Sequence, residues 1–277
     1  MAGRLEGKVA VITGASRGLG QYCAVGYAKE GAKLVIAART QEVRDERLPG
    51  TIYETARLVE EAGSEALPVV CNVADNASVE AMVKAALDKY GRIDILMTNA
   101  AIQPPGGIST MEIRHWELEF RVNVHGPFYC IRAALPSMIE QGSGNIINIS
   151  SVAANRGGSA YGATKRAIEA MTLGLSNELK DKGIAVNCLK PVGAIETPGV
   201  MFVYNAPGRR ASSTMAPPDS YVEAAILMAA QTVDTCTGAV YTDAEALQKL
   251  GGPGLYEHYK AMNPPVWAEP VQTFNTP

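Results

Sequence analysis

Short apolar runs alternate with longer segments of mixed apolar and polar positions along most of the chain. The runs have the length of strands and occupy residues 8–13, 34–38, 66–70, 93–101, 145–150, 185–189 and 238–242. Segments of helical character lie between them, at about residues 21–31, 51–62, 78–90, 111–120, 124–141, 161–180 and 221–231. This alternation predicts an α/β fold, a doubly wound parallel sheet of about seven strands with helices on both faces.

We expect one domain over residues 1–277, because a hydrophobic content of 47% fills a sizeable core and no linker interrupts the pattern. Residues 198–220 contain four prolines and no clean periodicity. We interpret them as a substrate cover, with an ordinary surface loop as the alternative. A C-terminal extension, residues 251–277, ends in a Pro-rich tail that is either disordered or packed on a neighbouring subunit.

The charge and cysteine content narrow the classes of function. A net charge of -3 gives no reason to expect a nucleic-acid or anionic-membrane partner, so small molecules are the expected ligands. The five cysteines are scattered without a C-x-x-C pair, which is typical of reduced thiols in a cytoplasmic protein. The first residues lack the apolar core of a secretory signal, and no apolar run approaches a membrane span. The three histidines lack the spacing of metal ligands, so no metal site is expected.

A glycine-rich turn, TGASRGLG, joins the first apolar run to the first helical segment. Gly14, Gly18 and Gly20 form the pattern G-x-x-x-G-x-G. Glycine permits a tight turn and a close backbone approach, and the N–H groups at the start of a helix bind a pyrophosphate. The order strand, glycine turn, helix favours a nucleotide site, with a plain turn as the alternative.

The end of the second apolar run indicates which nucleotide is bound. An acidic residue there would bind a ribose 2′-OH, but the run ends in Ala38, Arg39 and Thr40. Arg39 can face a 2′-phosphate, and Arg17 in the glycine turn can approach it from the other side. The sequence therefore favours NADP(H) over NAD(H). The alternative is that one or both arginines are solvated surface residues.

Tyr161 and Lys165 stand four residues apart in a predicted helix, so their side chains share one face. A free tyrosine has a pKa of about 10, and a fixed cation beside it favours the phenolate. The pair is a candidate for proton transfer near neutral pH. It lies just after the apolar run at residues 145–150, at the edge of the sheet where ligands of doubly wound folds bind.

Several motifs together resemble the short-chain dehydrogenase/reductase family: TGASRGLG, TNAA at residues 98–101, NVHG at 123–126, NISS ahead of YGATK, and P-x-G-x-I-E-T. The resemblance covers roughly residues 5–245. The segments LPGTIYETA and KPVGAIET are also similar to a branch that includes hydroxysteroid-dehydrogenase-like proteins. The family implies a Rossmann-type fold, hydride transfer between NADP(H) and a ketone, aldehyde or secondary alcohol, and a homodimer or homotetramer.

The resemblance also implies the roles of individual residues. Tyr161 is the general acid/base, and Lys165 binds the nicotinamide ribose and lowers the pKa of Tyr161. Ser151 hydrogen-bonds the substrate oxygen, and Asn123 holds a water in a proton relay. Asn72 and Val73 meet the adenine, and Ile195 and Thr197 meet the nicotinamide carboxamide. The implied cofactor contacts are Gly14, Ser16, Arg17, Gly18, Leu19, Gly20, Arg39, Thr40, Asn72, Val73, Asn99, Ala100, Tyr161, Lys165, Ile195 and Thr197.

The chain departs from the family pattern at four places. Ala101 replaces the last glycine of N-N-A-G, Asn72 replaces an aspartate, and Val192 separates the usual Pro-Gly pair. The fourth departure is a short spacing of ten positions between Ser151 and Tyr161, which leaves Ser150 as a rival for the catalytic serine.

Two other functions stay open at this level. One is reduction of an imine or an activated C=C bond by the same cofactor. The other is a nucleotide-sensing module without turnover.

Overall fold

The computed structural model describes residues 2–156, 159–204 and 215–262. Its sheet has seven strands in the order β3-β2-β1-β4-β5-β6-β7, and every neighbouring pair is parallel. The predicted doubly wound α/β fold is therefore confirmed. The strands are β1 (Val9–Thr13), β2 (Lys33–Ala38), β3 (Ala66–Val70), β4 (Ile95–Thr98), β5 (Gly144–Ile149), β6 (Ile184–Lys190) and β7 (Val240–Thr242).

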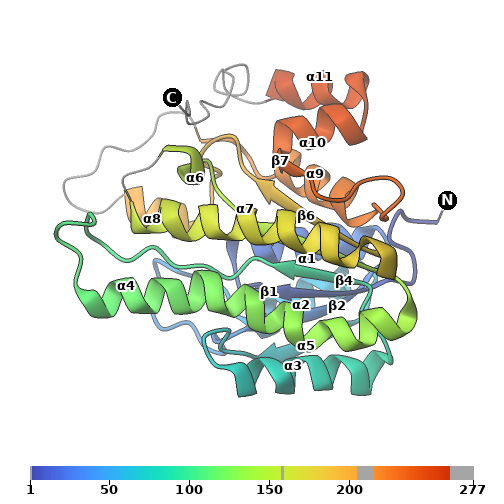
Figure 1. Cartoon of the computed structure of the whole chain (residues 1–277), viewed down its shortest axis with the longest axis horizontal. Helices are drawn as coiled ribbons and strands as arrows, with labels where there is room; N and C mark the ends of the chain where they lie inside the picture. The colour runs from blue at the N-terminus through green and yellow to red at the C-terminus, as the bar shows by residue number, and fades with distance from the viewer. Residues whose placement is uncertain (1, 157–158, 205–214, 263–277) are drawn as a thin grey trace.

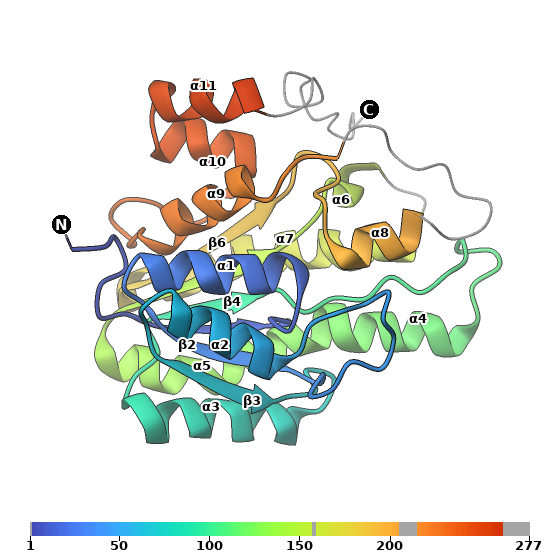
Figure 2. The same ribbon diagram turned by 180° about the vertical axis from the view of Figure 1, so that it is seen from behind.

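Helices cover both faces of the sheet. In the view of Figure 1, α3 (Asn76–Tyr90), α4 (Ile113–Phe120), α5 (Gly126–Gln141) and α7 (Ala160–Leu179) lie on the near face. The opposite face, seen in Figure 2, carries α1 (Gly18–Lys29), α2 (Ile52–Glu61) and α9 (Asp219–Ala229). Beyond α9 lie α10 (Asp243–Leu250) and α11 (Pro253–Met262), and α6 (Ala153–Arg156) and α8 (Pro198–Tyr204) lie near the proposed site.

The alternation of side chains along each strand divides the core in two. Ala10 and Ile12 on β1 pack on the side of α1 and α9, whereas Val11 packs on the side of α3 and α5. All three are 0% exposed, because helices cover the sheet on both sides. This explains why the strands appear in the sequence as continuous apolar runs rather than alternating ones.

Local capping chemistry fixes where α7 begins. The Ser159 hydroxyl accepts a hydrogen bond from Gly162 N at 2.9 Å, and the backbone of Ser159 is extended. A Cβ on Gly162 would lie 2.6 Å from Ala153 O, so a glycine there allows α6 to pack closely on α7. These two residues place Tyr161 in the first turn of α7, directly after the carboxyl end of β5.

Four helices were not predicted, among them α11, which occupies the start of the predicted C-terminal extension. The helix α10 begins with a capping box in which Thr242 and Glu245 exchange side-chain and backbone hydrogen bonds, a signal that is visible in the sequence T-D-A-E. The helices α6 and α8 are too short to show a period. In the segment that we interpret as a substrate cover, residues 198–220, α8 begins where Thr197 Oγ1 accepts a hydrogen bond from Val200 N at 3.2 Å. Residues 205–214 of this segment lie outside the described residues. The Pro-rich tail, residues 263–277, also lies outside them.

The two helical segments predicted at residues 111–120 and 124–141 form one nearly continuous rod. A π-helical turn, η1 (Arg121–His125), joins α4 to α5 in place of a break. Such wide turns often occur at functional sites, and this one carries Asn123. No helix in the described ranges has the length and apolar character needed to cross a membrane.

Asp243 ties the end of the sheet to the loop that follows β6. It is 1% exposed, and its Oδ1 accepts from Val192 N at 2.8 Å. Burial raises the pKa of this carboxyl group to about 7, although hydrogen bonds from backbone N–H groups oppose the shift. The folded protein therefore holds this proton at pH values where the unfolded chain has lost it.

We expect Asp243→Asn to reduce the pH dependence of stability between about pH 4 and pH 7. A carboxyl group with a raised pKa makes the protein less stable as pH rises through that window, by at most about 1.4 kcal/mol per unit. The amide of the variant still accepts a hydrogen bond from Val192 N but does not titrate. The free energy of unfolding of the variant therefore falls less steeply with pH than that of the wild type. Urea unfolding at a series of pH values measures this, and identical slopes for the two proteins would contradict it.

Candidate active site

Asn99 holds the glycine turn against the end of β4. Its side-chain Nδ2 donates to Thr13 O at 2.9 Å and to Gly14 O at 3.2 Å. In return, Thr13 Oγ1 accepts from the backbone N–H groups of Asn99 and Ala100, both at 3.1 Å. These four bonds join the carboxyl ends of β1 and β4, where the topology of doubly wound sheets places ligands.

Two glycines of the turn are required by this junction. A Cβ on Gly14 would lie 2.7 Å from Ala100 Cα, and one on Gly20 would lie 2.6 Å from Asn99 Nδ2. Gly18 differs, because its φ of +58° is the constraint and a Cβ there would only touch Thr197 at 3.4 Å. The sequence predicted close approach of a pyrophosphate as the reason for the glycines. The structure adds close packing of the turn on the protein itself.

The start of α1 fits an anionic group. Its N-cap residue, Arg17, is extended and makes no capping hydrogen bond with its side chain, and the first turn contains no acidic residue. Within the described part of the chain, the buried Nε of Arg17 has no partner either. Free N–H groups at a helix N-terminus bind phosphates. Ser16, which is buried, and Leu19, which is half-buried, flank Arg17 and Gly18 in this turn.

Arg17 and Arg39 form a local concentration of positive charge. Arg17 Nη2 lies 3.4 Å from Thr40 Oγ1 and 3.2 Å from Gly50 O, to which it donates. Burial lowers the pKa of the Arg17 guanidinium, and the charge of the exposed Arg39 lowers it further. A bound anion between the two side chains would relieve this repulsion.

The residues predicted at the adenine end lie after β3. Asn72 is exposed, and its Oδ1 accepts from Ala74 N at 3.3 Å within its own turn. Val73 is buried against α5, where a Cβ on Gly126 would lie 3.0 Å from Val73 Cγ2. The structure thus buries Val73 between the end of β3 and α5, and it leaves Asn72 at the surface.

The segment after β6 returns to the glycine turn. Ile195 is 3% exposed and forms an isolated parallel bridge with Ala216, and Thr197 lies beside Gly18. The hydrogen bond from Val192 N to Asp243 fixes the loop that runs from the end of β6 to Ile195 and Thr197. The inserted Val192 is therefore accommodated, and of the two residues predicted at the carboxamide Thr197 lies beside the glycine turn whereas Ile195 is buried in the core.

Tyr161, Lys165 and Ser151 come together at the carboxyl end of β5. Lys165 is 3% exposed, donates through Nζ to Ile149 O at 2.8 Å, and lies 5.5 Å from the centroid of the Tyr161 ring. Ser151 is half-buried, its Oγ accepts from Ala153 N at 3.2 Å, and its side chain has a lowering influence on the pKa of the Tyr161 phenol. Ser150 points elsewhere, because its Oγ donates to Glu169 Oε1 at 2.9 Å. The geometry supports Ser151 over its rival.

Burial dominates the charge states of this pair. It raises the pKa of Tyr161 to about 12, with a contribution in the same direction from the charge of Glu119 and an opposing one from Ser151. Burial also lowers the pKa of the Lys165 ammonium to about 8, although Cys188 and Glu119 oppose the shift. The sequence predicted that Lys165 lowers the pKa of Tyr161. In this structure the desolvation of the phenol outweighs that effect.

Asn123 connects three elements. It is 1% exposed, its Oδ1 accepts from Ile102 N at 2.9 Å, and its Nδ2 donates to Ile102 O at 2.8 Å and to Thr164 Oγ1 at 3.2 Å. Thr164 in turn donates to Tyr161 O at 2.8 Å. Both the oxygen and the nitrogen of the Asn123 side-chain amide are therefore hydrogen-bonded within the protein. These bonds fix the π-helical turn η1 to the loop after β4 and to α7.

Glu119 is a site residue that the sequence analysis missed. It belongs to α4, is 0% exposed, and affects the pKa values of both Tyr161 and Lys165. The sequence holds one signal, because Glu119 precedes Asn123 by four residues and so shares its helical face. Glu117 nearby has the same side chain and is exposed, so residue type alone does not separate the two.

A second buried charge cluster lies behind the serine pair. Glu169 on α7 accepts from Lys190 Nζ at 2.8 Å and from Arg166 at 3.0 Å, besides Ser150. Lys190 also donates to Asn155 Oδ1 at 3.2 Å, which ties β6 to α6. The cluster thus holds α6, which lies in the stretch where the spacing of this chain departs from the family pattern.

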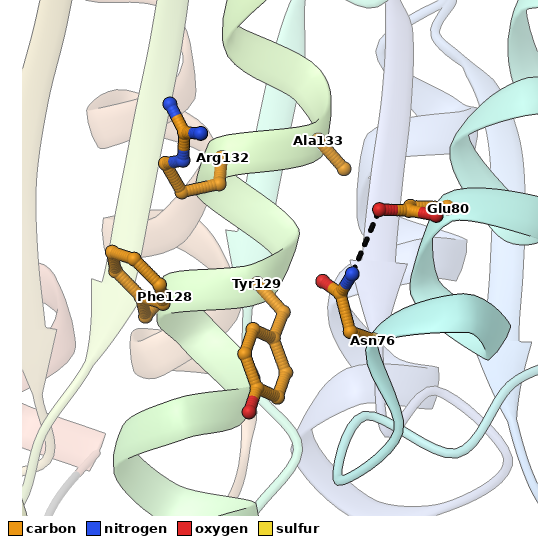
Figure 3. Close-up of a pocket in the computed structure, with 6 residues that line it drawn as sticks. All are labelled: Asn76, Glu80, Phe128, Tyr129, Arg132 and Ala133. Atoms are coloured by element: carbon orange, nitrogen blue, oxygen red, sulfur yellow. Dashed lines mark hydrogen bonds between the residues drawn. The ribbon is translucent and has the colours of Figure 1, made fainter.

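A pocket of about 330 Å³ lies elsewhere, on the outer side of α3 and α5 (Figure 3). In it, Asn76 Nδ2 donates to Glu80 Oε1 at 2.7 Å. The residues that line it are Asn76, Glu80, Phe128, Tyr129, Arg132 and Ala133. None of the predicted site residues lines it, so this pocket is separate from the candidate active site.

Comparison with known proteins identifies the class that this fold and site define. A family model described as short chain dehydrogenase matches residues 8–206, so the chain belongs to the short-chain dehydrogenase/reductase family. It is thus an oxidoreductase that acts on alcohol and carbonyl groups, and the family implies NAD(P)(H) as cofactor. The fit at the start of α1 agrees with a dinucleotide.

The most similar proteins include a 2,5-dichloro-2,5-cyclohexadiene-1,4-diol dehydrogenase from Sphingobium indicum, 37% identical over 201 residues, which are 72% of this chain and 77% of that protein. Hydroxysteroid dehydrogenase-like protein 2 from Xenopus laevis is 34% identical over 254 residues, 90% of this chain and 60% of that protein. The predicted similarity to that branch is therefore confirmed. A crystal structure of a short chain dehydrogenase from Mycobacterium thermoresistibile matches with a TM-score of 0.79 and 30% identity, over 88% of this chain and 87% of the other.

We expect Lys190→Met to destabilise the protein by roughly 3 kcal/mol, because it leaves the Glu169 carboxylate buried without its inner partner. Arg166→Met is the matched control, since Arg166 pairs with the same carboxylate but its side chain is 66% exposed. Loss of an exposed pair should cost less than about 1 kcal/mol. Urea unfolding of both variants measures the difference. Equal losses of stability would show that the buried pair of Lys190 with Glu169 stabilises the protein no more than the exposed pair of Arg166 with Glu169.

Proposed function

We propose that this chain interconverts a ketone or aldehyde with a secondary alcohol, using NADP(H), with Tyr161 as the general acid/base. The observation that carries the proposal is the meeting of Tyr161, Lys165 and Ser151 at the carboxyl end of β5, next to a helix start that fits a phosphate. The relative that acts on a cyclic diol suggests that cyclic alcohols and ketones belong among the first substrates to test.

The residues have distinct roles in reduction. The cofactor, when bound, supplies the hydride. Ser151 and Tyr161 hydrogen-bond the substrate oxygen, and Tyr161 donates its proton as alkoxide character develops. Lys165 donates one of its three N–H groups to Ile149 O, which leaves two donors for the ribose. Its positive charge also stabilises the phenolate. Asn123 keeps η1 in place, so that a relay water can be held there.

The charge states indicate which form of each group takes part in reduction. With a pKa of about 12, Tyr161 is protonated across the neutral range and is ready to act as an acid. With a pKa of about 8, Lys165 is charged at neutral pH and can stabilise the phenolate that results. Oxidation of an alcohol needs the phenolate first, which burial opposes.

The preference for NADP(H) rests on Arg17 and Arg39. Their mutual repulsion and the unpartnered Nε of Arg17 suit a 2′-phosphate, and Arg39 occupies the position where an acidic residue would bind a ribose 2′-OH. We also infer that the chain forms a homodimer or homotetramer. Exposed apolar side chains on α4, α5 and α7 support this: Ile113, Trp116, Leu118, Phe128 and Leu173. The five free thiols suit a reducing compartment such as the cytoplasm.

We expect Tyr161→Phe to lower kcat by about 10²–10⁴-fold, because the ring stays in place but the transferable proton is lost. NADPH consumption, screened over linear, cyclic and steroid ketones and ketoacids, supplies the substrate for this comparison. Wild-type turnover in the Phe variant would overturn the proposal.

Ser151→Ala and Ser150→Ala, assayed side by side, separate the two serines within the same experiment. We expect the first to reduce kcat by about 10²-fold, as for loss of a hydrogen bond to the developing oxyanion. Ser150→Ala should act mainly on stability through Glu169. Equal small losses of turnover would contradict the role of Ser151.

We expect Arg39→Asp to lower the ratio of kcat/KM for NADPH over NADH by at least about tenfold, since a carboxylate repels a 2′-phosphate and accepts from a ribose 2′-OH. Arg44→Asp, an exposed residue in the same connection, is the control for loss of positive charge. Assays of both variants with each cofactor measure the ratio. An unchanged ratio, or a wild type that prefers NADH, would contradict the assignment of NADP(H).

A further inference from the structure

Glu119 lies inside the protein next to the proposed acid/base pair. It belongs to α4, which packs against α7 on one face of the sheet (Figure 1). The residue is 0% exposed, and among residues 2–156, 159–204 and 215–262 neither carboxylate oxygen has a hydrogen-bond partner. A buried carboxylate without hydrogen bonds is strongly unfavourable, so this group must be neutral or balanced by a nearby cation.

The position of Glu119 in the helix directs it toward the site. It stands one turn before Asn123, whose amide binds Thr164 in the first turns of α7. Tyr161 precedes Thr164 and Lys165 follows it. The charges of Glu119 and these two residues influence one another, as the shifts of all three groups show. The carboxyl group is thus close enough to interact with the catalytic pair, although no hydrogen bond joins them.

Three titratable groups face one another here. Burial raises the pKa of Glu119 to about 7, and the charge of Lys165 opposes the shift. The charge of Glu119 raises the pKa values of Tyr161 and Lys165. From β6, Cys188 faces Lys165, but burial raises the pKa of its thiol to about 12, so it stays neutral. Lys165 is therefore the cation of the group, and Tyr161 and Glu119 are its two candidate anions.

We propose that Glu119 is a positioning residue that shares one negative charge with Tyr161 beside the Lys165 ammonium. The inference rests on the proposed function and deepens it. Lys165 and Glu119 are both buried, where charges are weakly screened, so ionised Glu119 disfavours the phenolate and protonated Glu119 favours it. When Tyr161 gives its proton to the substrate oxygen, the phenolate becomes the balancing anion and Glu119 stays in its neutral acid form.

The pH profile of alcohol oxidation tests the inference, because oxidation needs Tyr161 as a base. With saturating NADP⁺ and an alcohol that the wild type oxidises, the rise of kcat/KM with pH reports the ionisation of Tyr161. We expect Glu119→Gln to move this rise to lower pH by about one unit, since the amide cannot hold the competing charge. An unchanged profile overturns the inference.

Two further variants make the result specific. Glu117→Gln, an exposed change on the same helix, should leave the profile where it is. If Glu119→Gln fails to fold, Glu119→Met removes the acid without adding a buried amide, and the same shift is expected. A uniform loss of kcat at all pH values in both Glu119 variants would indicate a structural role only, and would also overturn the inference.

An infrared titration gives a readout that does not depend on turnover. The band of the protonated Glu119 carboxyl group is identified by its loss in Glu119→Gln. We expect it to disappear with a midpoint near pH 7, and a midpoint near the ordinary value of 4.5 would overturn the inference. Retained turnover in Tyr161→Phe would overturn the proposed function without altering this titration, so the two failures are distinguishable.

Discussion

A buried ammonium group with one fixed acceptor is the constraint on which the rest of the site depends. Lys165 is 3% exposed and donates to Ile149 O, the last residue of β5. Desolvation makes its charge costly, so the charge persists only if anions or dipoles surround it. The phenol of Tyr161, the carboxyl group of Glu119 and the open carboxyl ends of the strands provide that surrounding. The same desolvation that weakens the cation also makes its effect on nearby acids strong.

The sheet topology brings the parts of the site together at one edge. The strands β1, β4 and β5 are neighbours and parallel, so their carboxyl ends meet at one edge. Asn99 locks the first two ends through Thr13 and Gly14, and α7 follows directly after the third. The proposed phosphate binding at α1 and the proposed proton transfer at Tyr161 therefore depend on one junction. A change in the packing of that junction would displace both functions together.

Periodicity and motif order were enough to predict the sheet and most helices. The order of strands and helices predicts the topology because parallel strands need crossover helices. What escaped prediction depends on contacts between distant segments. The burial of Glu119 needs the packing of α4 on α7, and the bonds of Asn123 need the loop at Ile102. The burial of the Tyr161 phenol, which raises its pKa, likewise depends on the folded site and not on the Tyr-Lys spacing.

The geometry of strand exit explains how two adjacent serines acquire different roles. Successive side chains at the end of a strand point to opposite sides. Ser150, whose backbone N–H donates to Leu189 O as the sheet continues, turns its hydroxyl group toward Glu169 and the cluster with Lys190. Ser151 must then turn the other way, toward Tyr161. Lys165 and Glu169 lie one turn apart on α7, so the helix places one buried charge beside Ser150 and the other beside the end of β5. The short wall between Ser151 and Tyr161 can thus differ from the family without moving either catalytic group, because its support comes from α7 and β6 and not from its own length.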